Sequence, residues 1–480
     1  MKHVILGAGP AGVIAAETLR KHAPNDDITL IGDEPEAPYS RMAIPYLLIG
    51  KVGEEGTHLR HTAGHFERLR ISVRQGRAQK VDIQQRCVLL ADGSSVPYDR
   101  LLIATGSSPA TPPIPGIQGP GVHPCWTLAD ARAIMALAKP GARVLQMGAG
   151  FIGCIILEAL QQRGVKLSVV EMGDRMVPRM MGPTAGGMIK DWCEKKGVAV
   201  YTGARVEAIE RPAAVPAAPH PSMRPAPEPA VKPTLLQKIG NAIGVVHIPA
   251  PPPPAPWPAP APAVADGAMR VKLSTGQVLE ADLVISATGV KPNIGFLEDS
   301  GIRCLVGVLT DEHLQTNVPG VYAAGDCAEA FDKVSGTTIV SAIQPNAAEQ
   351  ARVAALNMAH RGPTPLADLK GVTQINVLDT LGLISASFGK WDGVPGGQQV
   401  ELADREAGKL LSLQFSGDQL VGCNSVGWTE HVGVMRGLVE GQVKLSAEWK
   451  QRLLDDPTLL MEAYLANAQA QDAMALVRQR

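Results

Sequence analysis

The feature that most constrains this chain is a glycine-rich turn between an apolar strand and a helix, which occurs twice. The first copy follows residues 3–6 and reads Gly7-Ala8-Gly9-Pro10-Ala11-Gly12; the second follows residues 143–147 and reads Gly148-Ala149-Gly150-Phe151-Ile152-Gly153. The first glycine permits a tight turn, the second lets a pyrophosphate approach the backbone at a helix N-terminus, and the third lets helix and strand pack closely. Two copies with the correct flanking periodicity predict two dinucleotide-binding domains.

The strand after the first turn ends near two carboxylates that could bind ribose hydroxyls. In most such motifs the acid directly ends the strand, but here Gly32 holds that place and the acid is displaced to Asp33 or Glu34. We favour Glu34 as the ribose-binding residue.

The strand after the second turn, at residues 166–170, ends directly at Glu171, at the usual distance of about 20 residues. A carboxylate there accepts hydrogen bonds from an adenosine ribose and repels a 2′-phosphate. The second site is therefore expected to prefer NADH over NADPH. Asp174 would also oppose a phosphate, whereas Arg175 could accept one.

Length and charge exclude several classes of protein. At 480 residues the chain is long enough for two or three domains, and its formal net charge of -1 provides no general attraction for nucleic acid or anionic lipid. No apolar stretch approaches the roughly 20 residues needed to cross a bilayer, and the first motif leaves no room for a signal peptide. We expect a cytoplasmic protein with no nucleic-acid partner and no transmembrane segment.

The seven cysteines are scattered, without C-x-x-C or C-x4-C spacing. This pattern argues against a disulfide framework, a zinc knuckle and a local redox dithiol, and it favours small buried apolar residues. No H-E-x-x-H or comparable arrangement of histidines occurs. We therefore expect no metal site.

Three further motifs carry a resemblance to a known family. Residues 101–106 and 283–289 both end in Ala-Thr-Gly, and residues 316–326 read Thr-Asn-Val-Pro-Gly-Val-Tyr-Ala-Ala-Gly-Asp. Together with the two turns, they resemble the FAD-dependent pyridine nucleotide-disulfide oxidoreductase superfamily over nearly the whole chain. The resemblance is greatest to its ferredoxin and rubredoxin reductases, its NADH oxidases and the flavin part of NADH-dependent nitrite reductases. It implies FAD at the first turn and NADH at the second.

The resemblance also implies which residues contact the cofactors. The family aspartate that matches Asp326 binds the ribityl chain of FAD, with a helix N-cap as the alternative role. The helix that opens with Gln344-Pro345-Asn346 is expected to direct its positive end at the flavin. Arg41 matches an arginine near the FAD diphosphate, with a solvated surface arginine as the alternative. The remaining implied contacts are Val81, Thr105, Gly106, Thr288 and Gly289.

The expected fold class is α/β, with two Rossmann-like, doubly wound three-layer domains and a C-terminal α+β interface domain. The motifs assign residues 1–117 and 291–366 to a discontinuous FAD domain, 118–290 to the NADH domain and 371–480 to the interface domain. The interface domain implies a homodimer, possibly within a larger complex.

The departures from the family bear on the chemistry. Disulfide-using relatives carry cysteines beside the flavin, but residues 38–46 contain none, and methionine cannot replace a thiolate. Ile155 and Trp126 stand where relatives often have glutamate and arginine, and no histidine precedes Pro457 to act as a base. The flavin carries the redox chemistry, so we predict direct hydride transfer without a catalytic side chain.

The predicted function is that of an FAD-dependent NADH oxidoreductase that passes electrons to a redox protein or a partner subunit without a redox-active disulfide. One alternative is an NADH oxidase or quinone-type reductase that acts on a small acceptor. Another is a weakly catalytic FAD-binding subunit of a larger redox complex. Surface shape and charge decide the acceptor, and no local motif reveals it.

Residues 211–266 are dominated by proline and alanine and interrupt the NADH domain. Such a composition cannot bury enough apolar surface to offset the entropy of ordering. We expect the segment to leave the domain at an exposed connection between strands, which loops tolerate. Residues 234–246 within it have apolar side chains at helical spacing. A docking helix is one hypothesis, and a neutral spacer is the one that we favour.

Overall fold

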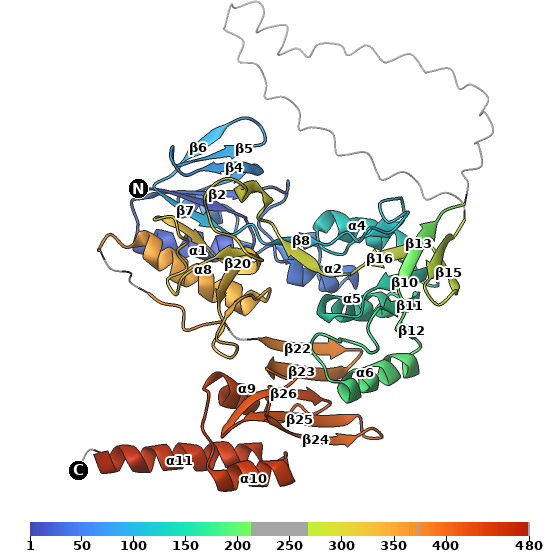
Figure 1. Cartoon of the computed structure of the whole chain (residues 1–480). Coiled ribbons are helices and arrows are strands. Elements are labelled where there is room, and N and C mark those ends of the chain that lie inside the picture. The colour runs from blue at the N-terminus through green and yellow to red at the C-terminus, as the bar shows by residue number, and fades with distance from the viewer. Residues whose placement is uncertain (213–266, 364, 366, 373, 479–480) are drawn as a thin grey trace, which may run out of the picture.

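The computed structural model describes residues 1–212, 267–363, 365, 367–372 and 374–478. Its fold is the expected α/β class. Two five-stranded parallel sheets stand beside each other, and a five-stranded antiparallel sheet lies beneath them in Figure 1. Among the described helices, none is both long and apolar enough to cross a membrane.

The first parallel sheet is built from two separated stretches of chain. Its strand order is β19-β7-β1-β2-β3, with bounds Val321–Ala323, Arg100–Ile103, Lys2–Leu6, Asp27–Gly32 and Ile71–Gln75. Helices α1 (Pro10–His22) and α8 (Gln344–Ala359) cover one face, and the meander β4–β6 (Ala78–Asp82, Cys87–Leu90, Ser95–Pro97) covers the other. Successive strand residues point to opposite faces, so Ile5 enters the core under the helices while Val4 and Leu6 enter the core under the meander.

The second parallel sheet repeats this plan. Its order is β12-β11-β10-β16-β9, with bounds Ala199–Thr202, Lys166–Glu171, Arg143–Met147, Leu283–Ser286 and Val122–His123. Helices α4 (Leu128–Leu137), α5 (Phe151–Gln162) and α6 (Pro183–Lys195) pack on one face. The meander β13–β15 (Val206–Glu210, Met269–Leu273, Val278–Ala281) packs on the other.

A two-stranded ribbon joins the two sheets. Its strands β8 (Ser107–Pro109) and β17 (Val290–Pro292) run antiparallel, and each follows one of the Ala-Thr-Gly motifs. The Asn293 N–H donates to the Gly106 carbonyl (2.9 Å), and the Ala110 N–H donates to the Gly289 carbonyl (2.8 Å). We refer to this ribbon as the crossover.

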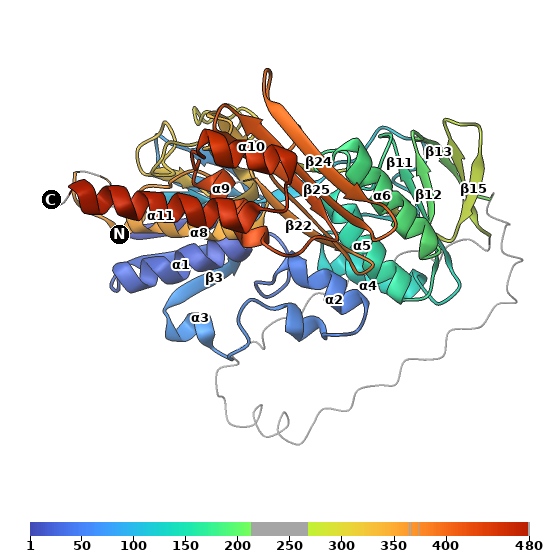
Figure 2. The same ribbon diagram turned by 90° about the horizontal axis from the view of Figure 1, so that it is seen from below.

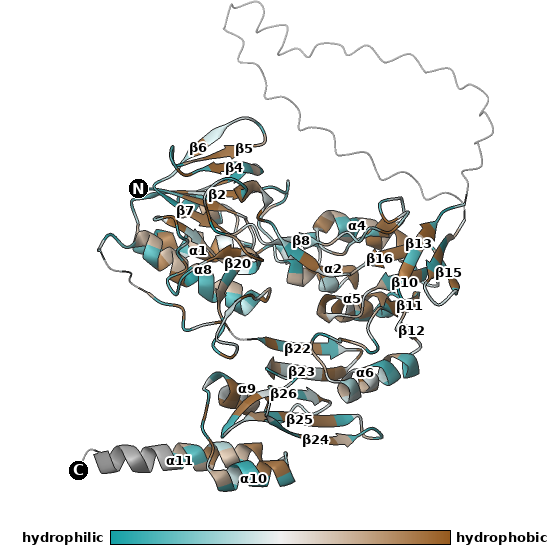
Figure 3. Cartoon of the chain, in the orientation of Figure 1, coloured by the Kyte–Doolittle hydropathy of each residue, from teal (hydrophilic) through white to brown (hydrophobic). Residues whose placement is uncertain are grey.

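The C-terminal sheet has the order β22-β23-β26-β25-β24, with bounds Ile375–Thr380, Leu383–Gly389, Gln419–Val426, Lys409–Ser416 and Gln398–Asp404. Helices α9 (Val432–Glu440), α10 (Ala447–Asp455) and α11 (Leu460–Arg478) lie against one side of it, as Figure 2 shows. Leu378, Leu383 and Val426 on its other side share a core with α5 and α6. Because α5 is enclosed between two sheets, its residues are largely hydrophobic, whereas hydrophilic residues predominate on the outer helix α6 (Figure 3).

Short elements complete the fold around the first sheet, and one of them, α2 (Ile44–Leu48), packs against α4 and α5 of the second sheet. The others are η1 (Arg41–Ala43), η2 (Glu54–Thr57), α3 (His65–Arg68), η3 (Gly295–Leu297), η4 (Gly325–Cys327) and the sheet β18-β20-β21 (Val308–Leu309, Ala328–Phe331, Thr338–Val340).

The proline-rich segment leaves the fold at a hairpin. Strands β13 and β14 pair antiparallel, with Glu210 opposite Arg270, so the chain departs and returns at the end of the outer meander. This is a connection between strands at the position expected from the sequence. Residues 213–266, including the docking helix hypothesised at 234–246, lie outside the described part of the chain.

Candidate functional site

The first turn, which we call the first cradle (residues 7–12), contains two glycines that the packing of the chain requires. Gly7 has a φ of +113°, and a Cβ there would lie 2.0 Å from the Ala104 carbonyl oxygen. A Cβ on Gly12 would lie 1.8 Å from the Gly7 oxygen. Gly9 has an ordinary φ of -79°, and a Cβ there would meet nothing within 4 Å. The open approach to Gly9, at the N-terminus of α1, fits a bound pyrophosphate.

A cavity of about 240 Å³ opens beside this cradle, at the carboxyl ends of β1 and β2. Parallel sheets bind ligands at this edge. The cavity is lined by Leu6, Gly7, Ile31, Asp33, Gly76, Arg77, Ala78, Thr105, Ser108, Asn293, Gly295 and Phe296. The sequence motifs pointed to three of these, Gly7, Asp33 and Thr105. Leu6, Ile31, Ser108 and Asn293 lie close to a motif in the sequence, whereas residues 76–78 and 295–296 carry no motif and reach the cavity only through the fold.

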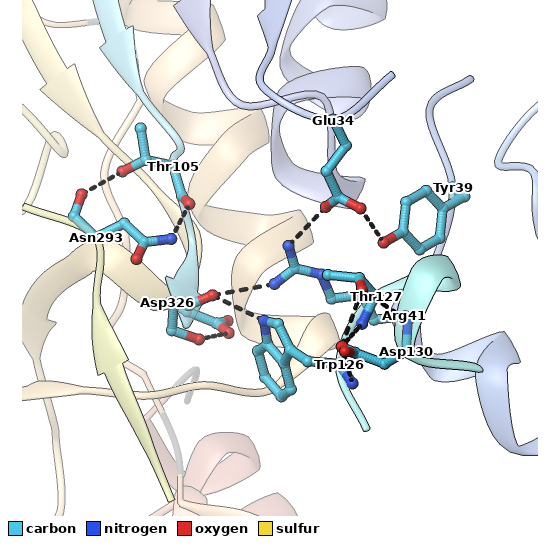
Figure 4. A network of polar contacts seen from close by, with 10 residues as sticks. Glu34, Tyr39, Arg41, Thr105, Trp126, Thr127, Asp130, Asn293 and Asp326 are labelled. Atoms are coloured by element: carbon cyan, nitrogen blue, oxygen red, sulfur yellow. Dashed lines mark hydrogen bonds and ion pairs between the residues drawn. The ribbon is translucent and has the colours of Figure 1, made fainter. Parts of the chain in front are cut away.

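Thr105 and Asn293 hold the crossover against the cavity. The Thr105 hydroxyl donates to the Asn293 carbonyl (2.8 Å), and the Asn293 amide donates to the Thr105 carbonyl (2.9 Å; Figure 4). Each residue thus satisfies the backbone of the other. Asn293 is a lining residue that sequence reasoning missed, although it stands only a few positions after the second Ala-Thr-Gly motif.

Asp33 lines the cavity, whereas Glu34, the acid favoured from the sequence, does not. Glu34 instead accepts hydrogen bonds from the Tyr39 hydroxyl (2.6 Å) and from Arg41 (3.0 Å). Because Gly32 prolongs the strand, Asp33 takes the position that opens onto the cavity. Of the two acids, Asp33 therefore faces the cavity, and the ribose-binding role of Glu34 stays a prediction from the sequence.

Arg41 is a partly buried residue held by several partners at this site. Its guanidinium bridges Glu34 and the Ser107 carbonyl (3.0 Å), and it stacks 5.0 Å from the centroid of the Trp126 ring. The Trp126 indole donates to the same Ser107 carbonyl (2.9 Å). Figure 4 shows Arg41 reaching from Glu34 toward Asp326. Trp126, which replaces the arginine common in relatives, therefore ties the start of α4 to the crossover and to Arg41.

Asp326 lies inside η4 and accepts a hydrogen bond from the Ser107 hydroxyl (2.8 Å). Burial raises the pKa of Asp326, and the Ser107 hydrogen bond and the charge of Arg41 partly oppose that shift. The preceding Gly325 has a φ of +80°, and its N–H donates to the buried Gln350 amide oxygen (2.7 Å). Gln350 on α8 is a second residue that sequence reasoning missed, because a single glutamine in a helix carries no distinctive signal.

The start of α8 lies beside the segment that contains Arg41. The Ser40 hydroxyl donates to the Gln344 side chain (3.3 Å), Pro345 occupies the first turn, and Asn346 donates to the Ser341 hydroxyl (2.6 Å). Ala11 of the first cradle lies close to Gly325, where a Cβ would approach it to 3.3 Å. The fold thus brings the first cradle, the Asp326 turn and the α8 N-terminus together.

The second turn, which we call the second cradle (residues 148–153), is constructed in the same way. Gly148 has a φ of +93°, and a Cβ there would lie 2.4 Å from the Ala287 carbonyl oxygen. A Cβ on Gly153 would lie 2.6 Å from the Gly148 oxygen, whereas one on Gly150 would meet nothing within 4 Å. Phe151 and Ile152 open α5 and pack partly into the core. This cradle also fits a pyrophosphate.

Glu171 lies against the second cradle. Its carboxylate accepts the Ala149 N–H (2.7 Å) and the Gly173 N–H (2.8 Å). Arg175, the cation considered as a phosphate partner, is turned toward its own loop, where it donates to the Met181 carbonyl (2.8 Å) and pairs with Asp174 (2.7 Å). The acid therefore faces the cradle, and the nearby cation is already engaged.

The other implied contacts lie outside the cavity. Gly106, with a φ of +67°, and Gly289, with a φ of +104°, shape the crossover, and the Thr288 hydroxyl donates to the Ala110 carbonyl (3.1 Å). Val81 pairs with Val88 in the first meander, and its side chain is buried in that core. Ala78, on the same strand, lines the cavity in its place.

The surroundings of the cysteine thiols do not favour nucleophilic reactions. All seven cysteines lie in the described residues and are unpaired, six of them buried and Cys304 partly so. Burial raises the pKa of Cys125 and Cys193 to about 12 and also raises the pKa of Cys327, next to Asp326. Thiolates are the reactive form, so these side chains are inert near neutral pH. The described residues contain no cluster of His, Cys, Asp or Glu that could hold a metal ion.

The model of the pyridine nucleotide-disulphide oxidoreductase family matches residues 1–218 and 261–355, which include both cradles and Asp326. The chain belongs to this family. It is an FAD-dependent NAD(P)H oxidoreductase, as predicted from the motifs.

Two curated proteins match along most of their length. The epsilon subunit of NADH-dependent phenylglyoxylate dehydrogenase from Aromatoleum evansii is 30% identical over 440 residues, which cover 91% of each chain. The NADH oxidase of Methanocaldococcus jannaschii is 27% identical and covers 88% of each chain. Among solved structures, the covalent putidaredoxin reductase–putidaredoxin complex has a TM-score of 0.78 at 21% identity and covers 98% of this chain and 99% of that chain. The last match shows the shared fold.

Proposed function

We propose that this oxidoreductase carries electrons from NADH through FAD to a protein acceptor, which is either a small redox protein or a partner subunit. The observation that carries the proposal is the pairing of two pyrophosphate cradles across one crossover, together with seven unpaired cysteines of which six are buried. Bound FAD would supply a hydride acceptor for the nicotinamide and a donor of one or two electrons. Without a dithiol to receive them, the electrons leave directly for an external acceptor.

The residues of the chain bind and orient in this proposal. Gly9 and Gly150 leave the two helix N-termini open to the pyrophosphates, and Asp326 and Arg41 lie where they would hold the FAD chain. Hydride transfer depends on approach distance and orientation, and a rigid crossover supplies both. Glu171 would accept ribose hydroxyls and disfavour a 2′-phosphate, which supports NADH over NADPH.

The relatives support a protein acceptor. The relative from Aromatoleum evansii is named as a subunit of an NADH-dependent dehydrogenase, and its match covers nearly the whole of both chains. A rhodocoxin reductase from Rhodococcus erythropolis is 27% identical over 75% of this chain and 72% of its own. The NADH oxidase relative favours a second candidate, the reduction of oxygen or another small acceptor. The homodimer and the cytoplasmic location stay predictions from the sequence.

Anaerobic titration followed by stopped-flow reoxidation tests the proposal. NADH should bleach the flavin absorbance completely, and NADPH should do so much more slowly. The reduced protein should then reoxidise much faster with ferredoxin-type proteins, or with a protein captured from the source cells, than with oxygen or a quinone. A faster reaction with oxygen or quinone would favour the second candidate, and a flavin that NADH leaves oxidised would contradict both.

A further inference from the structure

The loop that follows Glu171, residues 172–182, connects the second cradle to the C-terminal sheet through an unbroken series of hydrogen bonds. Glu171 accepts the Ala149 N–H, and the Ala149 carbonyl accepts the Val177 N–H (2.9 Å). The Val177 carbonyl in turn accepts the Met180 N–H (2.9 Å). Of the two polar groups of Ala149, the residue between the first two glycines, the N–H is therefore held by Glu171 at the end of β11 and the carbonyl is held by this loop.

Val177 holds the loop in a costly conformation. Its φ is +51°, and among the described non-glycine residues with positive φ it is the only β-branched one. A branched Cβ clashes with the backbone there, so such a residue is a true outlier. Val177 is also fully buried, in the core shared by α5, α6 and the C-terminal sheet. Conformations of this kind persist only where surrounding contacts enforce them.

Asn424, on β26 of the C-terminal sheet, supplies such contacts. Its amide donates to the Met180 carbonyl (2.8 Å), and its amide oxygen accepts the Gly182 N–H (2.9 Å). Its side chain is 2% exposed, and both of its functional groups are satisfied by the last residues of the loop. Only a carboxamide offers a donor and an acceptor in this geometry.

We propose that Asn424 is a positioning residue for NADH. It clamps the end of the strained loop, and the loop fixes Ala149 and Glu171 in the geometry that receives the nucleotide. The C-terminal domain, expected from the sequence only to form a subunit interface, thereby sets the shape of the second cradle. This inference rests on the proposed binding of NADH at that cradle.

Two other contacts span the same interface and offer a matched control. The Trp192 indole donates to the Leu381 carbonyl (3.1 Å), and Arg405 pairs with Asp191 (3.4 Å). Both involve α6 and not the loop. The Arg405 and Asp191 side chains are more than half exposed, so their removal tests the interface without touching the cradle.

The test compares Asn424→Ala, Asn424→Asp and Arg405→Ala as full-length, FAD-loaded proteins, with NADH as donor and ferricyanide as acceptor. Asn424→Ala should raise the KM for NADH roughly fivefold to tenfold, because two buried backbone groups lose their partner. Its kcat and flavin content should change little. Asn424→Asp keeps the acceptor for Gly182 but turns a second acceptor toward the Met180 carbonyl, so it should raise the KM at least as much as Asn424→Ala, while Arg405→Ala should leave the KM unchanged.

A rescue experiment separates positioning from simple loss of stability. Glycine adopts positive φ freely, so Val177→Gly in the Asn424→Ala background should bring the KM back toward the wild-type value, even though the loss of a buried side chain should lower the melting temperature further. A wild-type KM in soluble Asn424→Ala or Asn424→Asp, an equal rise in Arg405→Ala, or no rescue would each overturn the proposal. If NADH failed to bleach the wild-type flavin, the proposed function itself would fail, and the two failures are thus distinguishable.

Discussion

The two cradles share one construction and differ in what closes them. The cavity beside the first cradle is lined by five separated stretches of chain. Asp326 and Gln350 lie outside that lining, but Asp326 accepts a hydrogen bond from Ser107, next to the lining residue Ser108. The second cradle is shaped by residues 148–182, by the Ala287 carbonyl that follows β16 and by one clamp from the C-terminal sheet. A site assembled from many segments opens only when several of them move, whereas a local one opens easily. The difference suits a prosthetic group in the first cradle and an exchangeable cosubstrate in the second.

The most direct test of this difference between the cradles is to obstruct each pyrophosphate site separately with a side chain. A Cβ at Gly9 or at Gly150 would meet nothing within 4 Å, so the fold should tolerate valine there while its side chain displaces the pyrophosphate. Gly9→Val should purify without flavin. Gly150→Val should remain yellow but lose about 100-fold or more in kcat/KM for NADH, since misplacement of about 1 Å costs that much. Flavin absorbance and steady-state rates measure both effects.

Gly187→Ala is the control for these variants. Gly187 lies within α6, away from both cradles, and a Cβ there also meets nothing within 4 Å. Alanine at this position should leave both nucleotides unaffected and stabilise the helix by about 0.5–1 kcal/mol. If Gly9→Val kept its FAD, the assignment of the first cradle would be wrong.

The second largest effect should come from Asp326→Asn, which keeps an acceptor for Ser107 but removes the charge. Flavin affinity should fall about tenfold, because hydrogen bonds to charged groups contribute about 1.5–3 kcal/mol. The folded pKa of Asp326 is raised above 3.8, so its ionisation opposes folding as pH rises through the folded value. The flavin-free variant should therefore melt above the flavin-free wild type at pH 7, and the difference should vanish as pH falls toward 3.8. If the two flavin-free proteins melted at the same temperature at pH 7, this would contradict the expectation that ionised Asp326 destabilises the folded state.

Glu171→Gln tests the second cradle alone. The amide can accept one backbone N–H but directs its own donors at the other, so the KM for NADH should rise about tenfold. Discrimination against NADPH should narrow because no charge repels the 2′-phosphate. Flavin content should match the wild type. A parallel loss of flavin would mean that the two cradles are not independent.

The smallest effect should come from two salt bridges that join α4 to residues that precede the strand β3. Arg132 of α4 bridges Glu36 (2.7 Å) and Glu54 (2.6 Å) of the first domain, and it lowers the pKa of Glu54. Arg132→Ala should destabilise the protein by only about 0.5–1 kcal/mol, because the pairs are partly exposed and screened. Because the pKa of Glu54 is lower in the folded state than its ordinary value of 4.5, the ionised group stabilises the folded protein above pH 4.5. This stabilisation is lost as the pH falls through the folded pKa. Melting curves should therefore differ at pH 7 and converge below pH 4, and also at high salt.

The sequence predicted the parts of the site that depend on local structure. At Gly7 and Gly148 a side chain would clash with a neighbouring carbonyl, so strand, turn and helix fit together only with glycine. This requirement appears in the sequence as a glycine motif. Asp33 and Glu34 could not be separated, because the choice depends on which way the chain turns after Gly32. Whether Val81 or Ala78 faces the cavity likewise depends on strand register, because a shift of one residue turns every side chain of a strand to the opposite face.

Other residues were beyond prediction because they reach the site only through tertiary packing. Asn293, Gln350 and Asn424 are single amides in ordinary surroundings, and nothing in their neighbours distinguishes them. Trp126 was noticed as a departure from the family, but its stacking on Arg41 could be seen only once α4 had been placed beside the crossover. The direction of Arg175 likewise follows from the carbonyls of a folded loop.

The hairpin between β13 and β14 has a practical consequence. Glu210 and Arg270 face each other across an antiparallel pair, where strands are about 4.8 Å apart. A guest domain with neighbouring termini could be spliced there in exchange for residues 213–266 without stretching the host. A fluorescent protein or an affinity module inserted there would be attached to the meander β13–β15 beside the second sheet. The first sheet and the elements around it would stay unchanged.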